Sequence, residues 1–224
     1  MNTFRAYPTV GYRPALLLVT VAAVMLTLDG IWTPYSYWID ELFSVVASSE
    51  TPSRLFWHWI MVDVHPPLYQ FLLQGWISIF GAGETATRSL SALAALATIT
   101  LLTVTGLRRP RLAPLAILLL AMPYLYYNGQ ETRSYSMVYG FAVLLLLAQL
   151  EGRERLLRLT LVLLAWTHYF GLLLGLSLLF ARLLMARRLP RGDVVAGLLM
   201  LSWLPLHLHF GLLGSNVSGF WIAN

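Results

Sequence analysis

Long apolar runs constrain the fold of this 224-residue chain more than any other feature. A transmembrane α-helix needs about 20 mostly apolar residues, and several runs approach that length. Hydrophobic residues make up 58% of the chain and charged residues 11%, which is more apolar surface than a soluble domain can bury. We therefore expect an all-α integral membrane protein, a multi-pass bundle of about seven spans in a single domain over residues 1–224. The candidate spans are 14–28, 89–107, 112–127, 136–150, 156–166, 170–185 and 194–213.

The placement of arginine sets the expected orientation. All 15 basic residues are arginine, and 12 of them stand in four groups beside candidate spans. Cytoplasmic loops of membrane proteins are rich in arginine, so the four groups are expected in the cytoplasm, together with the N-terminus. Orientation in the membrane also explains the net charge of +5, and no nucleic-acid partner is expected. The groups are Arg5 and Arg13; Arg108, Arg109 and Arg111; Arg153, Arg155 and Arg158; and Arg182, Arg187, Arg188 and Arg191.

If the arginine groups are to share one side of the membrane, two apolar segments cannot be single membrane-crossing helices. The run 66–81 is predicted to be an interfacial or re-entrant helix on the outer face, with Pro66 and Pro67 in its first turn. The run 156–185 is predicted to break at 167–171 into a hairpin of two short helices. The first run, 14–28, is expected to be an uncleaved span because no cleavage site follows it.

The outer loop 29–88 carries two adjacent acids, Asp40 and Glu41, just after the first span. Helices are expected there over 40–48 and 53–62. Ionised carboxylates are costly beside a bilayer, which points to a functional role. The alternative is a solvated first helical turn, where the helix dipole favours negative charge.

Other polar side chains are expected at the same outer face, and they come from separate parts of the sequence. Convergence of ionisable groups at one membrane depth is typical of a site. Each has a structural alternative: a helix cap for His65, an interfacial anchor for Arg88, a solvated turn around Arg133 and a core position for His168. The candidate site residues are Asp40, Glu41, His65, Tyr69, Arg88, Glu131, Arg133, His168 and Tyr169.

Metal binding is left open by the sequence. The chain has no cysteine, so a thiolate site is excluded, and no fixed ligand spacing is present. Asp40 and Glu131 are the candidate ligands for a divalent metal.

A series of short motifs follows the first span. They are Asp40-Glu41, His65-Pro66-Pro67-Leu68-Tyr69, Phe80-Gly81, Arg88-Ser89-Leu90-Ser91-Ala92-Leu93, 127–137 and 167–171. The series resembles the GT-C membrane glycosyltransferases, in particular the bacterial protein O-mannosyltransferase and aminoarabinose-transferase branch. The resemblance covers nearly the whole chain in the family's order.

The resemblance implies transfer of a sugar from a polyprenyl-phosphate donor to a lipid, glycan or protein acceptor, on the outer face of a bacterial inner membrane. It implies that Asp40 and Glu41 are the catalytic residues and that Asp40 is the general base. Arg88 and Arg133 would stabilise the departing phosphate, because charge-assisted hydrogen bonds to phosphate are strong. Glu131 would orient the acceptor or help to hold a metal. The remaining candidates, His65, Tyr69, His168 and Tyr169, would contact the substrates.

Two other classes stay open. A transporter or lipid flippase would carry polar residues near mid-bilayer, whereas these spans carry theirs at the ends. A non-catalytic assembly protein is the second alternative. Family members are usually longer than this chain, so we expect an N-terminal fragment, truncated at the C-terminus.

Overall fold

The computed structural model describes residues 11–32, 36–61 and 65–212, and the described residues form helices and no strands. Short 3-10 turns lie at Gly30–Trp32 and Pro110–Leu112, and π-helical turns lie at Leu55–Ile60 and Leu208–Leu212. The α-helices are α1 (Tyr12–Asp29), α2 (Ile39–Ser48), α3 (Pro52–Arg54), α4 (Leu68–Phe80), α5 (Glu84–Arg108), α6 (Ala113–Leu120), α7 (Pro123–Asn128), α8 (Tyr135–Leu150), α9 (Glu154–Thr167), α10 (Tyr169–Ala186), α11 (Arg191–Leu201) and α12 (Leu204–His207).

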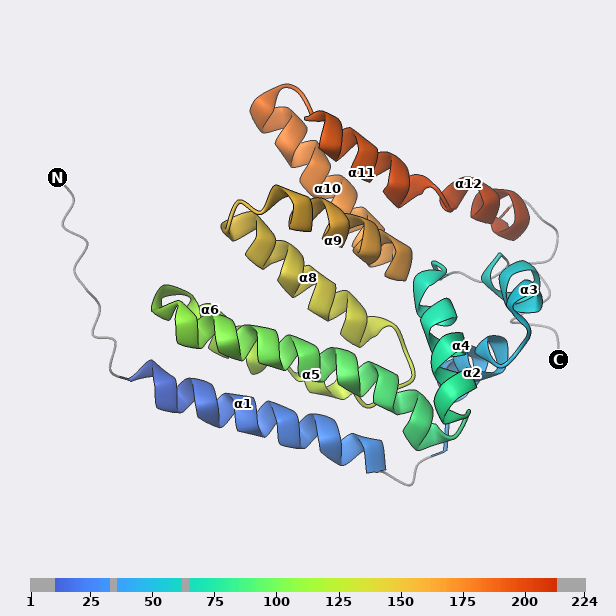
Figure 1. Cartoon of the computed structure of the whole chain (residues 1–224), viewed down its shortest axis with the longest axis horizontal. Coiled ribbons are helices and arrows are strands. Elements are labelled where there is room, and N and C mark those ends of the chain that lie inside the picture. The colour runs from blue at the N-terminus through green and yellow to red at the C-terminus, as the bar shows by residue number, and fades with distance from the viewer. Residues whose placement is uncertain (1–10, 33–35, 62–64, 213–224) are drawn as a thin grey trace.

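The long helices lie side by side, and α2, α3 and α4 gather at one end of them (Figure 1). We call this the loop end. The opposite end, the arginine end, contains the start of α1, the end of α5, the α8–α9 turn and the α10–α11 turn (Figure 1). The described arginines of the four groups therefore share one end of the bundle, as their sequence positions predicted, and Arg5 lies outside the described residues.

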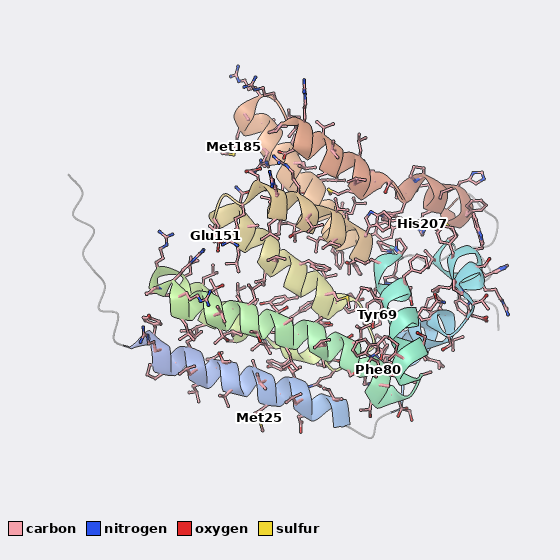
Figure 2. The ribbon with its side chains drawn as sticks, viewed as in Figure 1. Met25, Tyr69, Phe80, Glu151, Met185 and His207 are labelled. Atoms are coloured by element: carbon pink, nitrogen blue, oxygen red, sulfur yellow. The ribbon has the colours of Figure 1, made fainter. Side chains whose placement is uncertain are left out.

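Four helical segments are long and apolar enough to cross a membrane: Tyr12–Asp29, Glu84–Arg108, Tyr169–Ala186 and Arg191–Phe210. Leu68–Phe80, Pro110–Leu120 and Tyr135–Leu150 are apolar but shorter. The outer surface of the bundle is also apolar: Met25 is 64% exposed and Met185 is 87% exposed, and both lie on its outside (Figure 2). The chain is therefore a multi-pass membrane protein in its architecture.

Two apolar clusters hold the bundle together. One packs α1 and α5 against α6 and α8, and its buried residues include Leu16, Ile99, Leu102, Leu120 and Val143. The other packs α8 and α9 against α10 and α11, and its buried residues include Leu145, Leu161, Leu164, Leu179 and Met200. Glycines bring α10 close to its neighbours, because a Cβ on Gly171 would collide with the Leu164 carbonyl and one on Gly175 with the Met200 side chain.

The predicted hairpin in 156–185 is confirmed. Helix α9 ends at Thr167, α10 begins at Tyr169, and the two helices pack against each other. His168 between them has an extended backbone (φ −160°, ψ 150°), and its Nδ1 accepts a hydrogen bond of 3.1 Å from the Phe170 N–H. The side chain thus caps the start of α10, and the hairpin tip lies at the loop end.

The predicted short helix in 66–81 is also present, as α4, and it runs across the ends of the long helices rather than beside them (Figure 1). The placement of Pro66 and Pro67 in its first turn was wrong. The helix begins at Leu68, because the Pro67 carbonyl is the first acceptor of the helical ladder, with a hydrogen bond of 3.2 Å from Phe71 N–H. Both prolines therefore precede the helix.

Proline breaks two runs that were predicted as single helices. The run 112–127 divides into α6 and α7, since Pro123 favours an extended backbone at Met122 (ψ 120°). The run 194–213 divides into α11, α12 and a π-helical turn, with Pro205 at the start of α12; residue 213 lies outside the described residues. The helix expected over 40–48 is α2, whereas 53–62 begins as α3 and continues as a π-helical turn; Val62 lies outside the described residues.

Candidate functional site

A polar cluster occupies the loop end, where the first turn of α2, the start of α4, the start of α5 and the α7–α8 loop meet. Side chains from five places in the sequence converge there, since His168 of the α9–α10 turn joins them. We define the loop-end cluster as Asp40, Glu41, His65, Arg88, Arg133 and His168.

The two adjacent acids at the start of α2 point in different directions. Successive residues of an α-helix are separated by about 100° around the axis, so neighbours cannot share one face. The Glu41 side chain is 1% exposed, whereas the Asp40 side chain is 30% exposed. Of the two, Asp40 is therefore the one that a molecule outside the protein can reach.

Glu41 is held by four hydrogen bonds. Its Oε1 accepts from Arg88 Nε at 2.9 Å and from Thr132 N–H at 2.7 Å. Its Oε2 accepts from Arg88 Nη2 at 2.9 Å and from Trp38 N–H at 3.4 Å. The Arg88 side chain is 6% exposed and also lies 5.6 Å from the centre of the Tyr37 ring. This buried, forked pair joins α2, α5 and the α7–α8 loop.

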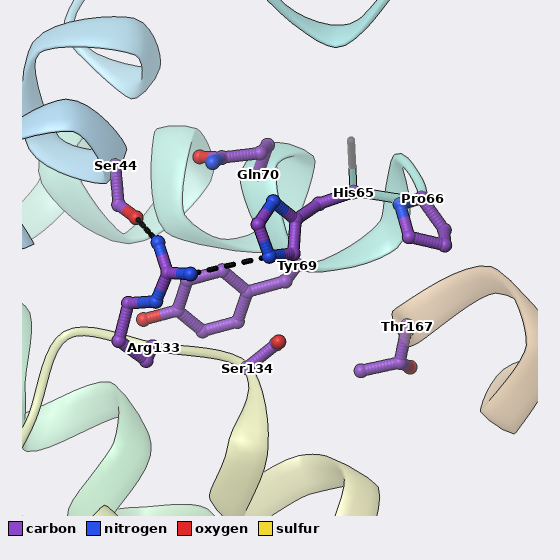
Figure 3. Close-up of a pocket in the computed structure, with 8 residues that line it drawn as sticks. All are labelled: Ser44, His65, Pro66, Tyr69, Gln70, Arg133, Ser134 and Thr167. Atoms are coloured by element: carbon purple, nitrogen blue, oxygen red, sulfur yellow. Dashed lines mark hydrogen bonds between the residues drawn. The ribbon is translucent and has the colours of Figure 1, made fainter. Parts of the chain in front are cut away.

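Arg133 faces Asp40 across the centre of the cluster (Figure 3 shows its other contacts). Its Nη1 donates to the Asp40 carbonyl at 3.1 Å and to Ser44 Oγ at 3.3 Å, and its Nη2 lies 3.1 Å from His65 Nε2. The same Nη2 is 3.7 Å from Asp40 Oδ2, an ion-pair distance longer than a hydrogen bond. Arg133 Nε is buried and has no hydrogen-bond partner among the described residues.

Aromatic rings complete the surroundings of Arg133. Its guanidinium carbon lies 5.6 Å from the centre of the Tyr135 ring, within cation–π range. The Tyr135 ring is 5.4 Å from the His168 ring, which in turn is 5.5 Å from the His65 ring. Rings in tilted and edge-to-face contact and a charged guanidinium thus form one continuous group at the hairpin tip.

His168 is neutral at pH 7. Burial first, and then the electrostatic effects of His65 and Arg133, together lower its pKa to about 4. Since its Nδ1 accepts the hydrogen bond from Phe170 N–H, the proton of the neutral ring is on Nε2. His168 can therefore donate a hydrogen bond from Nε2 without carrying charge.

Tyr69 lies beneath the cluster. It is 3% exposed, and its hydroxyl is 3.4 Å from Ser91 Oγ, which donates to the Arg133 carbonyl at 3.0 Å. Tyr69 and Arg133 line a cavity of about 10 Å³, room for roughly one water molecule. The other lining residues are Ser44, His65, Pro66, Gln70, Ser134 and Thr167 (Figure 3).

Glu131 is half-buried beside the cluster. Burial raises the pKa of its carboxyl, and the negative charge of Glu41 raises it further, while Tyr127, Arg133 and Arg88 act in the opposite direction. The described residues contain no group of three or more histidines, aspartates or glutamates that could hold a metal ion.

Tyr169 lies in a different aromatic group from the other candidates. Its ring packs 5.4 Å from the Trp203 ring and 5.9 Å from the His207 ring. It begins α10 directly after His168, and successive residues point in different directions. The ring is thereby directed toward α11 and α12.

Sequence reasoning missed Ser44, Thr132 and Tyr135 as members of the site. Ser44 follows Asp40 by four residues and so shares its helix face, a signal that was available in the sequence. Thr132 contributes through its backbone N–H, for which the residue type gives no signal. Tyr135 was part of the 127–137 motif but was not separated from its neighbours.

Comparison of the chain with protein-family models, with curated proteins and with solved structures found no match.

Proposed function

We propose that this chain is a membrane glycosyltransferase that moves a sugar from a polyprenyl-phosphate donor to an acceptor hydroxyl at the outer face of the membrane. One observation carries the proposal. A partly exposed carboxylate, Asp40, and a buried guanidinium, Arg133, face each other at 3.7 Å at the loop end of an apolar bundle. A carboxylate that can act as a base and a cation that can bind an anion thus lie side by side at the loop end, which supports the proposal.

The arrangement in the membrane follows the same proposal. Seven segments cross the bilayer: α1, α5, α6 with α7, α8, α9, α10, and α11 with α12. The arginine end faces the cytoplasm and the loop end faces outward. Helix α4 then lies along the outer interface, which suits its orientation across the ends of the spans (Figure 1).

The proposed reaction uses Asp40 as general base. Asp40 takes the proton of the acceptor hydroxyl while the acceptor oxygen forms a bond to the anomeric carbon of the donor sugar. The bond between that carbon and the phosphate oxygen breaks, and its electron pair leaves with the phosphate. A phosphate needs no proton to depart, so a single base suffices.

Arg133 has the contacts required of a phosphate-binding residue. Within the part of the chain that the structure describes, its buried Nε has no hydrogen-bond partner, and its Nη2 is 3.7 Å from Asp40 Oδ2. A phosphate that approaches from the exposed side would pair with the Arg133 guanidinium in place of Asp40. The Asp40 carboxylate would then be free to act as a base. Neutral His168, with a proton on Nε2, supplies a further uncharged donor nearby.

The test is sugar transfer in membranes that contain the protein, with a panel of undecaprenyl-phosphate sugars as donors. Asp40→Asn keeps the shape of the side chain and removes the base, and transfer is expected to fall by about 10²- to 10⁴-fold. Glu50→Gln is the matched control, because Glu50 is a partly exposed acid at the loop end that pairs with Arg54 at 3.3 Å.

Full activity of the Asp40→Asn variant would refute the assignment of the base. Absence of transfer by the unaltered protein with every donor would refute the proposed function. Lipid movement between leaflets in reconstituted vesicles would then identify a flippase, and inactivity in both assays would favour a non-catalytic protein.

A further inference from the structure

We propose that Glu41 and Arg88 are positioning residues, which act by anchoring the α7–α8 loop so that Arg133 meets Asp40. The inference rests on the proposed function, in which Arg133 binds a phosphate. It assigns to the buried pair a role distinct from that of base or phosphate ligand, the two roles that the sequence suggested.

Glu41 is unsuited to proton transfer with a substrate. Its side chain is 1% exposed, and each carboxylate oxygen already accepts two hydrogen bonds. An acceptor hydroxyl could reach it only after Arg88 or Thr132 had moved away. The donors around Glu41 belong to α5, the α7–α8 loop and the residue before α2, so the carboxylate connects three segments.

The hydrogen bond between Glu41 and Thr132 connects the buried pair to Arg133. The Thr132 N–H donates to Glu41 Oε1 at 2.7 Å, and the Thr132 hydroxyl donates to Thr87 Oγ1 at 2.9 Å. Thr132 precedes Arg133, and Ser91 Oγ donates to the Arg133 carbonyl at 3.0 Å. These three bonds fix the backbone on both sides of the Arg133 Cα.

A small displacement of Arg133 should be costly. Its guanidinium reaches Ser44, His65 and Asp40 at distances between 3.1 and 3.7 Å. A shift of about 1 Å in a site can reduce activity by about 10²-fold. Consecutive Cα atoms are about 3.8 Å apart, so releasing Thr132 is transmitted to Arg133 directly.

The role can be separated from simple stabilisation, because a buried ion pair replaced by apolar residues of similar volume is often as stable as the original. Two double variants provide the comparison. Glu41→Leu/Arg88→Met removes both charges and the acceptor for Thr132 N–H. Glu41→Gln/Arg88→Met removes both charges but keeps an amide oxygen that can accept from Thr132 N–H.

The probe is undecaprenyl phosphate, whose affinity is measured by titration of the purified protein in detergent together with the thermal midpoint. Both double variants are expected to unfold near the wild-type temperature. The leucine variant is expected to bind undecaprenyl phosphate about 10- to 100-fold more weakly, and the glutamine variant within a few-fold of wild type.

Equal affinity of the two double variants would overturn the inference, because the Thr132 hydrogen bond would then carry no effect. If neither double variant folds, amide hydrogen exchange in the unaltered protein tests the inference instead. The amide of Thr132 is expected to exchange slowly, and fast exchange there would also overturn the inference. Failure of the proposed function is distinguishable, because it appears as wild-type protein that transfers no sugar.

Discussion

The two ends of the bundle each carry an ionic cluster, and the clusters differ in how completely their charges are paired. At the arginine end, Glu154, Arg158, Arg182 and Asp193 link α9, α10 and α11, and we call this the arginine-end cluster. Asp193 is fully buried, and its two oxygens accept separately from Arg158 Nε at 2.7 Å and Arg182 Nε at 2.8 Å. Glu154 Oε2 accepts from both arginines.

The loop-end cluster is incomplete by comparison. Asp40 is partly exposed, and its carboxylate is 3.7 Å from its partner, while the buried Arg133 Nε has no partner among the described residues. A network with every charge satisfied rigidifies a fold, whereas unsatisfied capacity is what a ligand can use. The difference supports the proposed binding role of the loop-end cluster and is consistent with a structural role for the arginine-end cluster. Figure 2 marks the two ends, with Glu151 near the former and Tyr69 near the latter.

Substitution of one acid in each cluster should give opposite results, and this is the largest expected effect. Asp193→Asn removes the buried charge that pairs with two partly buried guanidinium groups and should reduce the free energy of unfolding by about 2–4 kcal/mol. Transfer per folded molecule should be unchanged. Asp40→Asn should leave stability near wild type and remove transfer. Thermal unfolding with activity assays on the folded fraction checks both, and loss of activity alone in Asp193→Asn would contradict the comparison.

Replacing one arginine by lysine in each cluster should have an intermediate effect. Lysine keeps the charge but lacks the planar fork with which arginine holds two partners in fixed directions. Arg133→Lys is expected to lower transfer by about 10- to 100-fold with little change in the unfolding temperature, because the fork to Ser44 and His65 is lost. Arg182→Lys, the matched control, should cost about 1–3 kcal/mol of stability and leave transfer unchanged. Loss of stability in Arg133→Lys together with loss of transfer in Arg182→Lys would contradict the roles assigned to the two clusters.

The smallest effect concerns pH. The pKa of His168 is about 4 in the folded protein against 6.5 in the unfolded chain, so the unfolded chain binds more protons between these values. Stability should fall as pH decreases from 6.5 toward 4. His65 and Arg133 oppose protonation of the His168 ring electrostatically. The His65 and Tyr135 rings also pack against it.

His168→Asn keeps a side-chain acceptor at the start of α10 but cannot titrate. Its unfolding temperature should therefore fall less than that of wild type between pH 7 and pH 5. His58→Asn, at an exposed histidine, is the control and should keep the wild-type dependence. Equal slopes for all three proteins would show that His168 does not change protonation on folding.

The sequence predicted the fold well where hydropathy and arginine placement agreed. The hairpin at His168 and the short helix α4 followed from the need to keep four arginine groups on one side. The breaks at Pro123 and Pro205 were missed because apolar composition alone does not register the missing N–H group.

The site was predictable as a set of residues but not as a set of contacts. Adjacent acids in a helix must diverge, yet which of Asp40 and Glu41 turns inward depends on where α5 lies. The pairing of Glu41 with Arg88 joins residues 47 positions apart, which no local pattern specifies. Tyr169 followed His168 in the motif, but helix geometry directs it toward Trp203.

The measurement that tests the central claim most directly is undecaprenyl-phosphate binding by the Asp40→Asn and Arg133→Gln variants, together with sugar transfer. Asp40 competes with a phosphate for Arg133, so Asp40→Asn should bind undecaprenyl phosphate as tightly as wild type or more tightly, and yet transfer no sugar. Arg133→Gln should lose binding. Weaker binding by Asp40→Asn, or transfer that survives in it, would contradict the assignment of base and phosphate-binding residue to this pair.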